Sequence, residues 1–177
     1  SYTGTTTLNG NLSASAISIT GNANLGANAI TLASTNGGDV KITGSVTGKD
    51  DQTGTALTVN AGAGDVGVGS ATSHISQIAL TGGNITVGNV TTSVSTADSN
   101  ANVTFGGTID GANSQSHSLS VNTGYGSMAF DGAIGGTQVL SSLTLTSSEN
   151  PDSEQALASD GAITFASGAN VKLVGNF

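Results

Sequence analysis

The sequence contains no cysteine, no arginine and no tryptophan, and only one proline among its 177 residues. A chain without cysteine forms no disulfide, which fits a protein that meets varying redox conditions outside the cell. Three lysines stand against eleven acidic residues, so the net charge is -8. With so few cations, counterion release cannot drive nucleic-acid binding, and an anionic membrane surface would repel the chain. We therefore expect no nucleic-acid partner and no membrane insertion.

Long hydrophobic runs are also missing. No apolar run approaches the roughly 20 residues of a membrane helix, and no signal-peptide pattern is present. The chain begins at Ser1 without an initiator methionine, so we expect a processed product or an excised piece. Charged residues make up only 8% while β-branched residues are frequent, which is the opposite of the composition of disordered chains. These features predict a folded all-β protein.

Short units of the form apolar-x-apolar recur along the chain between glycine, asparagine, aspartate, serine and threonine, which favour turns. Each unit predicts a short strand with one buried face. The units are Ile17–Ile19, Ile30–Leu32, Val40–Ile42, Leu57–Val59, Val66–Val68, Ile78–Leu80, Ile85–Val87, Val103–Phe105, Leu119–Val121, Met128–Phe130, Leu143–Leu145, Ile163–Phe165 and Val171–Leu173.

The units repeat as a block. Residues 40–80 align with residues 103–145 at offsets of 62 to 65, and partial repeats follow at 85–99 and 163–173. We interpret an offset near 63 as about three turns of a coil with roughly 21 residues each, which is typical of a solenoid.

The sequence thus predicts one domain over residues 1–177, a right-handed parallel β-helix (β-solenoid). Coils of roughly 20 to 25 residues, stacked at the ordinary strand spacing, would give about eight coils. The segment 147–161 breaks the pattern. Asn150 can cap a helix and Pro151 suits its first position, so we expect a short helical excursion near residues 150–158.

Gly62, Gly64 and Gly67 have the G-x-G-x-x-G spacing of a dinucleotide-binding loop. That motif binds pyrophosphate only where a strand ends and a helix begins. The residues after Gly67 lack the apolar spacing of a helix, and the related stretch 122–132 continues into alternating Met128–Phe130. We therefore predict that these glycines form coil corners and bind no nucleotide.

The stretches "ALTVNAGAGDVGVG", "SLSVNTGYGSMAFDGAIGG", "LSSLTLT" and "GAITFASGANVKL" resemble the strand repeats of large bacterial surface proteins of the filamentous haemagglutinin and autotransporter-passenger kind. The resemblance covers residues 37–177. It implies a secreted, surface-exposed β-helical shaft involved in adhesion, aggregation or matrix building. The N-terminal secretion module with Asn-Pro-Asn motifs and the C-terminal barrel of such proteins have no counterpart in this sequence.

Enzymatic and metal-binding functions find little support. Polysaccharide-cleaving β-helices need basic residues or clustered carboxylates in a groove, and His74 and His117 fall in polar turns, where we expect solvated side chains. Ser116–Ser118 places a serine beside a histidine, but neighbours on a strand point to opposite faces. We expect no catalytic residue, no metal ligand and no cofactor. The acidic loops are the only candidates for calcium, and they carry Asp50, Asp51, Asp152 and Glu154.

Three functions remain open. The first is the rigid, non-catalytic shaft of a bacterial adhesin at the cell surface, with host or matrix glycans or proteins as partners. The second is a self-assembling extracellular fibre subunit of a biofilm or sheath matrix, whose ends stack between copies because an open solenoid end is an unpaired strand edge. The third is an ice-binding solenoid, which needs a flat array of outward threonines. The candidates for that array are Thr58, Thr86, Thr104, Thr144 and Thr164.

Overall fold

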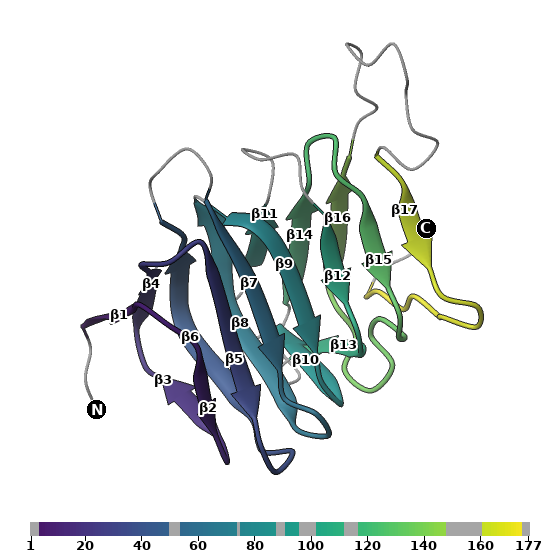
Figure 1. The fold of residues 1–177 in the computed structure, drawn as a ribbon. Coiled ribbons are helices and arrows are strands. Elements are labelled where there is room, and N and C mark those ends of the chain that lie inside the picture. The colour runs from purple at the N-terminus through teal and green to yellow at the C-terminus, as the bar shows by residue number, and fades with distance from the viewer. Residues whose placement is uncertain are drawn as a thin grey trace.

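A computed structural model describes the chain over residues 4–49, 54–73, 75–87, 91–95, 102–111, 117–147 and 161–174. Every regular element in these residues is a β-strand, and none is a helix. The strands pair in parallel and stack as successive coils of a solenoid, as the sequence predicts. In Figure 1 the colour advances from purple at one end of the stack to yellow at the other. The proposed helical excursion at 150–158 lies outside the described residues.

Each coil passes over three faces, named here in the order in which the chain meets them. The third face is a seven-stranded sheet, in which the strands lie side by side in the order in which they occur along the chain. Its strands are β2 (Leu12–Ala14), β5 (Ala29–Ser34), β7 (Thr55–Asn60), β9 (Ile75–Thr81), β12 (Val103–Phe105), β15 (Met128–Phe130) and β17 (Ile163–Phe165).

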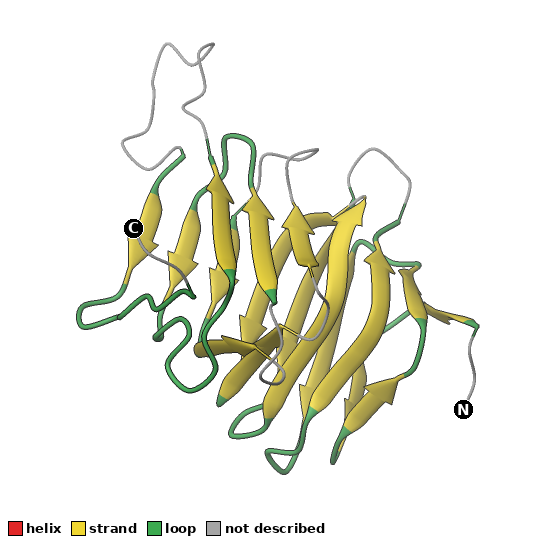
Figure 2. Ribbon diagram, turned by 180° about the vertical axis from the view of Figure 1, so that it is seen from behind, coloured by secondary structure: helices red, strands yellow, loops and turns green. Residues whose placement is uncertain are grey.

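The first and second faces form one ten-stranded sheet because two long strands, β6 (Val40–Thr47) and β8 (Asp65–Ser73), run across both. Their pairing shifts register between Ile42 and Ser45, where one face gives way to the next. The first face adds β3 (Ile17–Ile19), β10 (Asn84–Val87) and β13 (Thr108–Gly111). The second face adds β1 (Thr5–Leu8), β4 (Asn22–Leu25), β11 (Thr91–Ser95), β14 (Ser118–Asn122) and β16 (Ser142–Thr146). Figure 2 shows these strands from behind.

The core lies inside the coils, where every second side chain of a strand points inward. On the third face one inward column begins at Leu12 and ends at Phe165, with a residue from each strand in register. Its last three members stack as aromatic rings: Phe105 and Phe130 have centroids 5.0 Å apart, and Phe130 and Phe165 5.1 Å. Apolar side chains therefore pack on apolar side chains of the next coil, which buries apolar surface continuously along the solenoid.

The prediction of about eight coils is not confirmed, because the longest uninterrupted stack contains seven strands. Paired residues on neighbouring coils lie 25 positions apart from Phe105 to Phe130, within the predicted coil length. The separation rises to 35 positions from Phe130 to Phe165, because the segment 147–161 is inserted there. Insertions between strands thus lengthen some coils and leave the register of the stack intact.

The interpretation of the 63-residue offset as three whole turns is wrong. Val40 lies in β6 on the first face, whereas its repeat partner Val103 lies in β12 on the third face. Leu57 of the third face likewise aligns with Leu119 of the second face. The offset therefore spans two coils and two further faces. The aligned units of the repeat therefore lie on different faces of the solenoid.

Gly62 and Gly64 of the glycine motif lie in the turn between β7 and β8, and Gly67 lies within β8, the strand that follows the turn. Gly62 has a positive φ of 61°, and its N–H donates to Asn60 Oδ1 at 2.9 Å. A Cβ on Gly64 would lie 2.5 Å from the carbonyl carbon of Gly38 in the neighbouring coil. The same turn recurs at Gly124, with φ 59°. Gly62 and Gly64 thus form a coil corner, as predicted, whereas the prediction is wrong for Gly67, which lies within a strand.

Candidate functional sites

The first candidate site is the last coil of the solenoid, whose core side chains are only partly covered. Ile163 and Phe165 in β17 are each 40% exposed, although they continue the inward columns of the third face. Phe130, one coil earlier in the same column, is 0% exposed. The difference arises because β17 pairs only with β15 in the described part of the chain. This coil therefore presents an apolar surface and an unpaired strand edge.

The opposite end of the third face is similar. Leu12 in β2 is 37% exposed and pairs on one side with Leu32 of β5. Leu12 and Phe165 are the first and last members of the same inward column. The two ends of this face therefore present the same kind of surface at the same position of the coil.

The second candidate site is a polar groove of about 420 Å³ on the outer surface of the first face. Most of its lining comes from four successive coils, through strands β6, β8, β10 and β13. The rest comes from Thr137 and Gln138 in the segment between β15 and β16. The side chains used below are Lys41, Asp65, Asn84, Thr86, Asp110 and Gln138.

Register explains why these residues meet. Lys41 pairs with Gly67, Gly67 with Thr86, and Thr86 with Asp110, so the four positions form one outward column along the solenoid. Gly67, between Lys41 and Thr86 in this column, has no side chain. A Cβ added at Gly67 would lie 3.3 Å from Lys41 Cγ. The Lys41 side chain therefore lies beside the position that a side chain at residue 67 would occupy.

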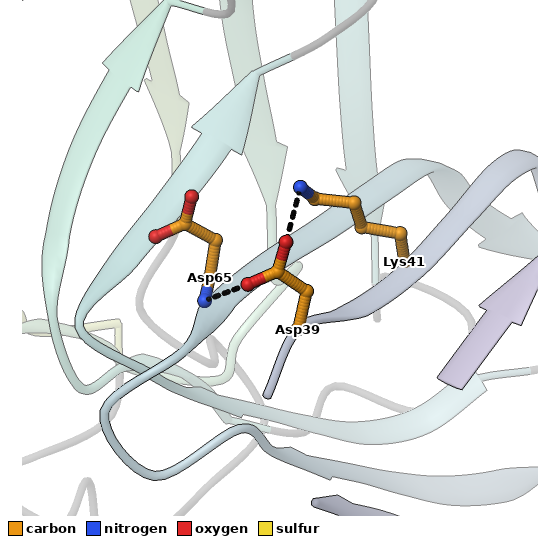
Figure 3. Close-up of polar contacts among 3 residues, drawn as sticks. All are labelled: Asp39, Lys41 and Asp65. Atoms are coloured by element: carbon orange, nitrogen blue, oxygen red, sulfur yellow. Dashed lines mark hydrogen bonds and ion pairs between the residues drawn. The ribbon is translucent and has the colours of Figure 1, made fainter. Parts of the chain in front are cut away.

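An ion pair lies at one end of the groove. Lys41 Nζ donates to Asp39 Oδ2 at 2.6 Å, and the Asp65 N–H donates to Asp39 Oδ1 at 3.0 Å (Figure 3). The hydrogen bond from Lys41, followed by the one from the Asp65 amide, lowers the pKa of Asp39 below its usual 3.8. The same bond raises the pKa of Lys41 above 10.5. Figure 3 shows the Asp65 carboxylate directed away from this pair, and Asp65 is one of the residues that line the groove.

A buried carboxylate lies at the other end. Asp110 is only 5% exposed, and its Oδ1 accepts hydrogen bonds from the N–H groups of Thr137 at 2.9 Å and Gln138 at 3.1 Å. The Gly111 N–H also donates to the Gln138 carbonyl oxygen at 3.0 Å, which fixes the loop over β13. Asp110 Oδ2 has no hydrogen-bond partner in the described part of the chain. One carboxylate oxygen therefore positions the loop, and the other is free to bind a ligand.

Several residues singled out in the sequence can now be placed. The expectation of a solvated His117 is wrong, because its side chain is buried and its carbonyl oxygen accepts bonds from Ser141 N and Oγ. A strand, β14, begins directly after it, so the residue belongs to the coil and not to an exposed turn. The remaining candidates fall outside the described residues: His74, Ser116, Asp50, Asp51, Asp152 and Glu154. Among the residues that are described, no group of three or more metal-ligating side chains forms.

The threonines proposed for ice binding do not share one face. Thr58, Thr104 and Thr164 belong to one outward column of the third face, interrupted by Ala79 and Ala129. Thr86 lies on the first face and Thr144 on the second. The pattern of outward threonines is therefore discontinuous.

Comparison with protein-family models, curated proteins and solved structures gives no match for this chain. Within the described residues, no helix is long and apolar enough to cross a bilayer. The fold and the two sites consequently carry the functional argument.

Proposed function

We propose that this chain is a segment of the rigid, non-catalytic shaft of a secreted bacterial surface adhesin, coiled as a right-handed parallel β-helix. The observation that carries the proposal is the last coil, where Ile163 and Phe165 are 40% exposed although they occupy core positions. Covering a large apolar side chain contributes about 1.5 to 3 kcal/mol, so a further coil stacked on β17 would stabilise the protein.

The remaining properties agree with a shaft. Stacked parallel coils are joined by hydrogen bonds over three faces, and the low charge leaves few groups whose ionisation could loosen the structure. Parallel strands connected by crossovers are almost always right-handed, which supports the handedness. The resemblance of residues 37–177 to strand repeats of bacterial surface proteins supports the surface location.

A fibre subunit is the second candidate, and one observation favours it. Leu12 and Phe165 end the same inward column, so a second copy stacked end to end would continue the column without a shift. Such a contact joins unlike ends and repeats without closing, which produces filaments. In this arrangement, a copy of the protein would take the place of the next coil.

Labelling and imaging test both candidates. Antibodies raised against the purified chain should bind intact cells of the producing bacterium, and labelling only after permeabilisation would refute a surface protein. Electron microscopy across a range of protein concentrations at neutral pH then separates the two forms. Short rods at every concentration identify a shaft segment, whereas long filaments of uniform width identify a fibre subunit.

A further inference from the structure

The groove on the first face is independent of the ends of the solenoid, and it has the features of a binding site. It extends along the outward column from Lys41 to Asp110, which are three strand spacings apart, or roughly 14 Å. A ligand that fills it would be elongated and would lie along the solenoid.

Asp110 provides the strongest sign of a ligand. Burying a carboxylate is costly unless hydrogen bonds compensate it, yet Asp110 Oδ2 lacks a partner in the described chain while the residue is 5% exposed. The backbone amides of Thr137 and Gln138 hold the carboxylate in place through Oδ1. Asp110 lines the groove, and its carboxylate is already held in position, so binding a donor at Oδ2 costs little further ordering.

The other lining groups define the chemistry of the ligand. Thr86, Asn84 and Gln138 can each donate and accept hydrogen bonds, while Asp65 and Asp110 accept when ionised. The carboxyl groups of Asp65 and Asp110 and the net charge of -8 disfavour an anion. A bare divalent cation is also disfavoured, because Asp65 and Asp110 lie on strands separated by β10 and the described residues form no metal-ligand cluster.

We propose that this groove binds a neutral saccharide chain. Hydroxyl groups on a sugar ring are both donors and acceptors, and they match a lining of carboxylates, amides and hydroxyls. An extended oligosaccharide also matches the length and direction of the groove. This inference rests on the proposed adhesin function and names the class of its partner. A fibre subunit could carry the same site, because the groove includes neither end of the solenoid.

Titration calorimetry tests the site with named probes: cellohexaose, maltohexaose, chitohexaose and mannohexaose, with hexagalacturonate as the anionic control and calcium chloride as the cation control. We expect at least one neutral hexasaccharide to bind and hexagalacturonate not to bind. Asp110→Asn keeps an oxygen for the loop amides but removes the charged acceptor, and it should weaken binding about tenfold.

Thr86→Val and Thr104→Val form a matched pair, since both threonines are half-buried outward residues but only Thr86 lines the groove. Thr86→Val should weaken binding about tenfold, and Thr104→Val should leave it unchanged. If Asp110→Asn does not fold, the two threonine variants alone test whether the saccharide binds in the groove. Absence of binding by all four neutral probes, equal affinity in both threonine variants, or calcium binding lost in Asp110→Asn would overturn the proposal. Surface labelling of cells tests the adhesin proposal separately, so the adhesin proposal and the saccharide proposal can be refuted independently.

Discussion

At the scale of single residues, neighbouring side chains of a strand alternate between the core and the outer surface. Val59 is fully buried between Leu32 and Leu80 of the adjacent coils, whereas its neighbour Thr58 is exposed on the outer surface. An unpaired carboxylate between two coils costs several kcal/mol, which is comparable with the total stability of about 5 to 15 kcal/mol of a domain.

Val59→Asp is therefore expected to abolish folding, and Thr58→Asp to change the melting temperature little. Far-UV circular dichroism and thermal melting measure both variants. A Val59→Asp protein with unchanged spectrum and melting would show that the inward assignment of this strand is wrong.

The Asp39–Lys41 pair makes stability depend on pH. Because the folded state lowers the pKa of Asp39, its contribution is present above its usual 3.8 and is lost as pH falls through the lowered value. The raised pKa of Lys41 has the opposite sense: its contribution is present below 10.5 and disappears as pH rises through the raised value. Both side chains are nearly half exposed, so solvent screens the effect.

Asp39→Asn should lower the melting temperature slightly at neutral pH, and the difference from wild type should shrink at acid pH. The exposed Asp131, changed to Asn, is the control for losing a carboxylate without an ion pair. A constant difference between wild type and Asp39→Asn from neutral pH to well below pH 3.8 would contradict the assignment.

At the scale of elements, the close approach of coils at their corners limits which residues fit there. Gly64→Ala would place a Cβ 2.5 Å from backbone atoms of Gly38, whereas a Cβ on Gly10 meets nothing within 4 Å. Forcing a coil apart costs about 1 to 3 kcal/mol. Urea denaturation should show that loss for Gly64→Ala and almost none for Gly10→Ala. Equal midpoints would mean that the turn relaxes without cost.

The sequence predicted those strands in which apolar residues alternate, because the pattern itself records the buried face. Strands such as β1 and β13 were missed, since Thr5–Leu8 and Thr108–Gly111 each contain one large apolar residue and are held by pairing with neighbouring coils. The change of face along the repeat was also missed. All three faces use the same apolar-x-apolar unit, so the sequence does not distinguish them.

The groove could not be predicted for a related reason. Lys41, Thr86 and Asp110 form no motif in the sequence, and they become neighbours only when the register of four coils is known.

At the scale of the whole molecule, the proposed end-to-end stacking can be tested at the exposed last coil. Ile163→Lys places a charge on the uncovered core surface, and Thr164→Lys places the same charge on the outer surface one residue away. If copies stack end to end, only Ile163→Lys should abolish concentration-dependent growth in analytical ultracentrifugation. Growth that persists in both variants would exclude stacking through β17. A wild-type chain that stays monomeric throughout would favour the shaft.

The parallel pairing of the coils also has a mechanical consequence. Hydrogen bonds between neighbouring coils point along the axis of the stack, so a tensile force on the two ends is transmitted from one coil to the next in series. The weakest interface then yields first, and each released coil lengthens the chain by about 25 residues at 3.3 to 3.6 Å per residue. A tether built this way would respond to a sudden pull by extending in steps, and would absorb work at each step before its attachment fails.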